Sequence, residues 1–176
     1  SMLEELDKEA RELLKEVRRL VEDNDRLLEE LLRRARELLE RNDRISEKVA
    51  DEVRKIDDEK RVRELADESR KISREILEEV RRLVKELKDD SKRILDEVRK
   101  RVTDLDERVR RLLAERPTER MREVAKKVKD ILKRAEEEVR ESLERVRREL
   151  ERVIRELEDS LRRNDKTLRD LIEERR

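Results

Sequence analysis

Residues 13–56 read LLKEVRRLVEDNDRLLEELLRRARELLERNDRISEKVADEVRKI, and their apolar side chains return to one helical phase every 18 residues. Eighteen residues make five whole turns of an α-helix at 3.6 residues per turn. Because such a repeat does not drift around the helix as a heptad does, it predicts long, nearly straight helices packed side by side. The rows are Leu13, Leu31 and Val49; Leu14, Leu32 and Ala50; Val17, Ala35 and Val53; and Leu20, Leu38 and Ile56.

The composition favours a helical bundle over a disordered chain. Of the 176 residues, 59% are charged and 33% are hydrophobic, and the sequence contains one Pro and no Gly. High charge alone is typical of disorder. Here the apolar residues keep to one face, which is typical of long helices and coiled coils. We therefore expect an all-α protein with one elongated core.

Charge balance and missing residue types argue against several function classes. The 52 basic and 52 acidic side chains leave a net charge of zero, unlike the basic surface of a nucleic-acid-binding protein. The sequence has no aromatic residue on which single-stranded bases could stack. No apolar run approaches the roughly 20 residues of a membrane span, and no signal-peptide pattern is present. We expect no nucleic-acid or membrane partner and no required partner.

The start of the chain and its Cys content add two expectations. Ser1-Met2 has the form of a cleavage remnant before an initiator Met, which is typical of a recombinant product. We therefore expect a soluble protein from cytoplasmic expression. With no Cys there is no disulfide framework.

Two segments lose the apolar phase and carry turn residues. The first is residues 57–61, where Asp57 or Asp58 can cap the following helix through its carboxylate. The second surrounds the only proline, Pro117, which is tolerated in a first helical turn, with Thr118 as an alternative cap. The resulting helices are expected over about residues 3–56, 60–114 and 119–174 of a single domain, 1–176.

Short connections require antiparallel neighbours, so the sequence predicts a single-chain, up-down-up three-helix bundle. An alternative places breaks at Asn- and Asp-containing sites such as residues 23–25 and 41–43, which would produce a row of short helices. The apolar phase passes through these sites without slipping, as Leu20, Asn24 and Leu31 show. Continuous helices are therefore favoured.

Polar residues inside the apolar stripe fall at matching levels. When the chain is folded at its two turns, three groups form, each with one Asn and two Ser and one member from each helix. These groups are Asn24, Ser91 and Ser142; Asn42, Ser73 and Ser160; and Asn164, Ser46 and Ser69, with Thr167 close to the last. Because a buried polar group is costly unless it is hydrogen-bonded, we expect structural buried polar layers that penalise shifted registers. The alternative is a polar cavity for a ligand.

No catalytic constellation is evident. Asn and Ser without His, Cys or an activating base provide neither a nucleophile nor a general base, so we expect no enzyme, catalytic residue or cofactor. Asp90 and Glu149 fall in apolar rows at nearby levels and could together bind a metal. Without His, however, they are better explained as residues at the edge of the stripe, and no metal is expected.

Matched helix lengths, minimal loops, the 18-residue repeat and the Asn/Ser layers resemble a de novo designed helical bundle with buried hydrogen-bond networks. The resemblance covers the whole chain and implies a structural scaffold with no natural substrate. A surplus of apolar residues flanks the stripe of the first helix and leaves an alternative, an interaction module that forms a homo-oligomer or one component of a designed heteromeric assembly. A weaker alternative is lipid binding by the opened helices. The flanking residues are Leu14, Val21, Leu28, Leu32 and Leu39.

Overall fold

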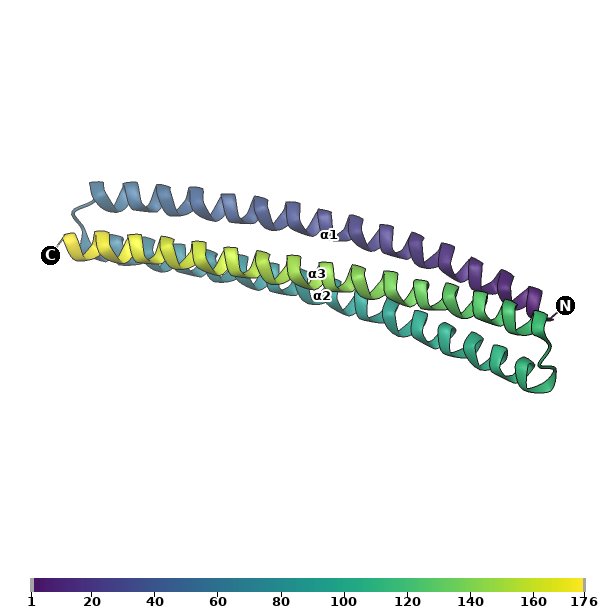
Figure 1. Ribbon diagram of the computed structural model, residues 1–176. Helices are drawn as coiled ribbons and strands as arrows, with labels where there is room; N and C mark the ends of the chain where they lie inside the picture. Colours follow the sequence, from purple (N-terminus) through teal and green to yellow (C-terminus); the bar gives the residue numbers. More distant parts are fainter. Residues whose placement is uncertain (1, 176) are drawn as a thin grey trace. The chain divides into compact units, whose positions relative to one another are not determined.

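The computed structural model describes residues 2–175 and contains three α-helices joined by two short connections (Figure 1). Helix α1 spans Met2–Lys55, α2 spans Glu59–Glu115 and α3 spans Glu119–Glu174. Each helix is continuous through its Asn- and Asp-containing sites, so the alternative of many short helices is wrong. No helix within residues 2–175 is long and apolar enough to cross a membrane.

Contacts divide the chain into two compact units, each built from one segment of every helix. Unit 1 consists of the described residues of Ser1–Leu28 and Leu87–Arg147, and unit 2 of those of Glu29–Glu86 and Arg148–Arg176. The organisation of the three helices as a single domain therefore stays a prediction.

The ion pairs of unit 1 establish that α1 and α2 run in opposite directions. Arg101 pairs with Glu16 of α1, and Arg108, one step further along α2, pairs with the earlier residue Glu9. Helices α1 and α3 run in the same direction, because Arg18 bonds to Glu138 and Arg145 bonds to Asp25, and each pair is 120 residues apart. This is the up-down-up order of a three-helix bundle.

Unit 2 has the same antiparallel relation between α1 and α2. Ser73 of α2 bonds to Asn42 of α1, whereas Glu79, further along α2, pairs with the earlier residue Arg34. The antiparallel order follows from the short connections. A connection of two or three residues can only turn the chain back alongside the helix that precedes it.

The apolar stripe supplies the core of both units. The row Val17, Ala35 and Val53 is buried at every position. Residues of all three helices meet in each core, and charged side chains cover the opposite faces. The main buried residues of unit 1 are Leu6, Ala10, Leu13, Val17, Val98, Leu105, Val109, Val128, Leu132, Ala135 and Val139. Those of unit 2 include Val49, Val53, Val62, Leu65, Ala66 and Leu168.

Side chains before α2 and α3 accept hydrogen bonds from otherwise unpaired backbone N–H groups. Asp58 Oδ1 accepts from the N–H of Lys60 at 3.0 Å. Thr118 Oγ1 accepts from the N–H of Met121 at 3.2 Å. Asp58 and Thr118 are thus the N-caps, and Pro117 precedes the cap instead of lying in the first turn of α3 as one expectation had it.

We predict that Asp58→Ala and Thr118→Ala each lower the free energy of unfolding by about 1 kcal/mol, because each leaves a helical N–H without its side-chain acceptor. Guanidinium unfolding followed by far-ultraviolet circular dichroism measures this loss. Asp57→Ala is the matched control, since Asp57 makes no hydrogen bond among the described residues and should cost distinctly less. An equal loss at positions 57 and 58 would contradict the assignment of the cap.

Candidate functional site

The first polar layer lies in unit 1 and is only partly hydrogen-bonded. Asn24, Ser91 and Ser142 are each 3% exposed. The Ser91 hydroxyl donates to Asn24 Oδ1 at 3.1 Å. The Ser142 Oγ atom is buried without a hydrogen-bond partner among the described residues. Within this group the hydrogen bond joins α1 to α2, and a layer that joins all three helices stays a prediction.

The second layer lies in unit 2 and divides into two separate contacts. The Ser73 hydroxyl donates to Asn42 Oδ1 at 2.9 Å, and Asn42 Nδ2 is buried without a partner in the described chain. Ser160, expected beside these two residues, instead donates to Oδ1 of Asp43 at 3.0 Å. The layer thus links α1 to α2 through Asn42, and α1 to α3 through the next residue.

Asp43 joins α1 to α3 and is not among the polar residues expected from the sequence. Its Oδ1 atom accepts from Ser160 and also from Asn164 Nδ2 at 2.9 Å, so one carboxylate serves two α3 side chains. The signal was present in the spacing, because Asp7, Asp25 and Asp43 form their own 18-residue row. This acidic row lies at the border of the stripe, outside the apolar phase.

The third group does not form the hydrogen-bonded layer that the sequence predicts. Ser69 is buried and Ser46 half-buried, yet neither hydroxyl has a hydrogen-bond partner among residues 2–175. Asn164 turns to Asp43 instead. Thr167 is exposed and donates to the backbone oxygen of Arg163 at 3.0 Å, so its expected place in a buried layer is wrong. The exposed Thr167 hydroxyl is satisfied within its own helix.

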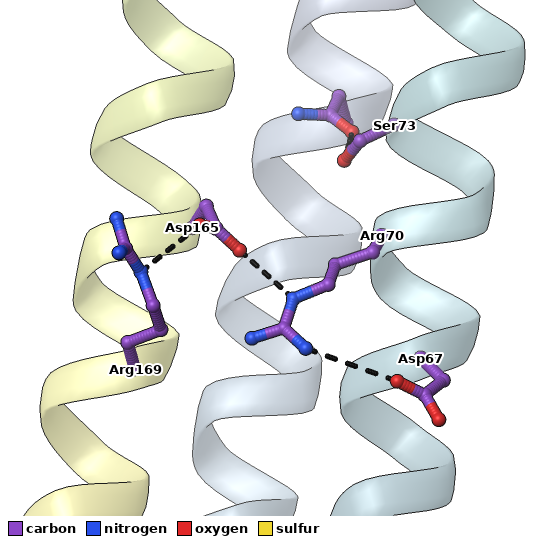
Figure 2. Close-up of polar contacts among 6 residues, drawn as sticks. Asp67, Arg70, Ser73, Asp165 and Arg169 are labelled. Atoms are coloured by element: carbon purple, nitrogen blue, oxygen red, sulfur yellow. Dashed lines mark hydrogen bonds and ion pairs between the residues drawn. The ribbon is translucent and has the colours of Figure 1, made fainter.

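A chain of alternating charges runs from Arg169 through Asp165 and Arg70 to Asp67 (Figure 2). Arg70 of α2 donates through Nε to Asp165 of α3 at 2.9 Å. Asp165 also pairs with Arg169 at 3.1 Å, and Arg70 with Asp67 at 3.8 Å. These four side chains connect α2 to α3 within unit 2, and their charges neutralise one another.

The Arg108 guanidinium of α2 pairs with the Glu9 carboxylate of α1. Its hydrogen bond to the Glu9 carboxylate, at 2.6 Å, raises the pKa of the guanidinium, partly opposed by burial and assisted by the negative charges of Glu9, Asp104 and Glu5. A raised pKa in a base stabilises the fold below the ordinary pKa of Arg, and that contribution is lost only as the pH rises through the folded value. The contact therefore persists throughout the neutral range and acts structurally.

Asp90 and Glu149 lie at the edge of the stripe and are half-exposed. Asp90 pairs with Arg93, and Glu149 pairs with Arg152 at 3.9 Å, each within its own helix. Across residues 2–175, no group of three or more His, Cys, Asp or Glu side chains is placed to hold a metal ion. These two carboxylates are neutralised by residues one turn away, as edge positions allow.

Comparison with known proteins finds a solved structure with the same three-helix fold. The chain is similar to a solved structure described as a computationally designed three helix bundle, with a TM-score of 0.60 and 17% sequence identity. The likeness covers 99% of this chain and 88% of the other. The two share a fold. No protein-family model and no curated protein matches the sequence.

The two serines of the first layer provide a matched test of its bonding. Ser142→Ala should raise the free energy of unfolding by about 1 kcal/mol, because it removes a buried hydroxyl that has no partner. Ser91→Ala should lower it by about 1 kcal/mol, because it leaves Asn24 Oδ1 without its donor. Guanidinium unfolding of both variants checks the opposite signs. Equal effects of the two substitutions would show that the bonding is not as described.

Proposed function

We propose that the chain is a designed structural scaffold without a natural enzymatic activity, in which the core polar residues specify helix register and fold. The observation that carries the proposal is the contact between Ser91 and Asn24, two polar side chains that meet inside an otherwise apolar core. A shifted register would leave both groups buried beside apolar side chains, which costs about 1–3 kcal/mol for each unpaired group.

The same reasoning extends to unit 2. Ser73 and Asn42 form a second contact between α1 and α2, and Asp43 joins α1 to Ser160 and Asn164 of α3. Sliding α3 by one helical turn would remove both acceptor contacts of Asp43 at once. Polar residues at a few core positions thus supply a specificity that uniform apolar packing lacks.

The flank of α1 bears on the alternative, an interaction module. Leu14 and Leu28 are buried by other residues of this chain, and Val21, Leu32 and Leu39 are half-buried. Within the described residues, the large exposed hydrophobic side chains are Met2 and Leu27. Because other residues of the same chain cover this flank, a self-contained scaffold is favoured over an assembly that needs a partner.

The proposal is tested by replacing the whole first layer with apolar residues. Asn24→Leu combined with Ser91→Ala and Ser142→Ala should retain or raise the free energy of unfolding while loosening register or association. Light scattering reports the mass, expected near 21.6 kDa for the parent protein. Spin labels on cysteines introduced at the exposed positions Lys15 and Lys100 report the α1–α2 register as a distance distribution. We expect one narrow distribution for the parent and a broadened or double one for the variant.

Val17→Ala is the matched control for stability without specificity. Val17 is fully buried in the same unit, and its truncation should lower the free energy of unfolding by about 2 kcal/mol. Mass and label distance should stay those of the parent. A triple variant that loses much stability while keeping a single mass and a narrow distribution would contradict the role in specificity.

A further inference from the structure

The third polar group surrounds a cavity in unit 2. A cavity of about 310 Å³ lies between α2 and α3 and is lined by Ser46, Ser69, Leu77, Leu161 and Leu168, among others. Its volume is at the lower end of the roughly 300–1,000 Å³ typical of ligand pockets. It arises because short Ser side chains stand where the stripe would otherwise place larger apolar residues.

A second cavity, of about 360 Å³, opens between α1 and α3 at the same level. The two cavities share Ser46, Ser69, Asn164 and Leu168 as lining residues. Small side chains from α1 and α2 thus leave space on both sides of the same residues. The hollow is a property of the whole third group and not of a single side chain.

Ser69 is the polar group that faces this hollow without a partner. Ser69 is 6% exposed and lines both cavities. Its hydroxyl has no hydrogen-bond partner within the described residues 2–175. The hydroxyl of Ser69 can both donate and accept a hydrogen bond. A ligand that brings a hydroxyl group to Ser69 would therefore gain a hydrogen bond.

The remaining walls determine the rest of the ligand. Leu77, Leu161 and Leu168 present apolar surface to the cavity between α2 and α3. Four charged residues of the described chain border it: Arg70 pairs with Asp165 at 2.9 Å, Arg162 pairs with Asp159 at 2.9 Å, and Arg74 is exposed. An ionic ligand would have to compete with these pairs, or pair with Arg74 in water, where an ion pair contributes little, whereas a neutral ligand would leave the pairs in place.

We propose that the cavity between α2 and α3 in unit 2, lined by Ser46, Ser69 and Leu168, binds a small neutral molecule. This molecule carries an apolar ring and one hydroxyl group, and Ser69 is its hydrogen-bond partner. Phenol is the simplest probe of this class. Neither the polar layers of the proposed scaffold function nor their role in register requires such a ligand, so the two proposals stand or fail separately.

The chain offers a clear signal for the test. It contains no Trp, Tyr, Phe or Cys, so circular dichroism in the aromatic region comes from bound phenol. Titration of the full chain with phenol should give a saturable signal with one molecule per chain and a Kd on the order of 1 mM. Phenol should also raise the midpoint of guanidinium unfolding, because it binds only the folded protein.

Variants at Ser69 separate the hydrogen bond from the space. Ser69→Ala should weaken phenol binding about fivefold, the loss expected for one hydrogen bond, and leave the binding of toluene, which has no hydroxyl, unchanged. Ser69→Leu should fill the cavity and weaken both ligands more than tenfold. Thr103→Leu, at an exposed position in unit 1, is the control and should bind both ligands like the parent.

Three outcomes would overturn the proposal. One is the absence of a saturable phenol signal from the folded parent protein. Another is unchanged phenol binding in the folded Ser69→Leu variant, which would place the ligand elsewhere. The third is an equal effect of Ser69→Ala on phenol and toluene, which would remove the assigned role of the Ser69 hydroxyl.

Discussion

Each helix has one apolar stripe along its length. The side chains of this stripe are shielded from water only where they pack against the stripes of the other two helices. Side chains such as Val17, Val109 and Val128 are completely buried in this way, although more than half of all residues are charged. Burial of a large apolar side chain contributes about 1.5–3 kcal/mol. Surface ion pairs contribute far less, so the phase of the stripe governs which faces of the helices meet.

Polar residues inside the stripe are constrained by the same burial. Asn24 and Ser91 satisfy the constraint by bonding to each other, and Asp43 satisfies it for Ser160 and Asn164. Ser142 is buried without a hydrogen-bond partner among the described residues. Ser69 also makes no hydrogen bond to the described chain, and the space beside it is the proposed ligand site of unit 2.

Much of the fold follows from the sequence because periodicity and turn chemistry act locally. The helix bounds differ from the expected ones by at most one residue at each end, and Asp58, one of the two residues expected to cap the second helix, does so. The positions of the polar residues along the helices could also be predicted, because antiparallel helices joined at two turns of known position have little freedom in register. Asn42 beside Ser73 is one result of that geometry.

The hydrogen-bond partners were harder to predict from the sequence. They depend on the direction in which each side chain points around its helix, and not on its position along the helix. Asn164 bonds to Asp43, a residue outside the apolar phase, and Thr167, which directly precedes the buried Leu168, is exposed. Ser142 lies at the right level but points to no acceptor. A shift of one residue along a helix rotates a side chain by about 100°, because an α-helix has 3.6 residues per turn, and this separates the exposed Thr167 from the buried Leu168.

The account rests on contacts made inside one chain in one register, and isotope-filtered nuclear Overhauser effects test this most directly. In uniformly labelled protein, we predict nuclear Overhauser effects between the Asn24 side-chain amide and the β-protons of Ser91. We predict the same between the Asn42 side-chain amide and the β-protons of Ser73. The same effects should be absent from the filtered spectrum of mixed labelled and unlabelled chains. Asn24 contacts one turn or more away from Ser91, or contacts that appear between chains, would contradict the account.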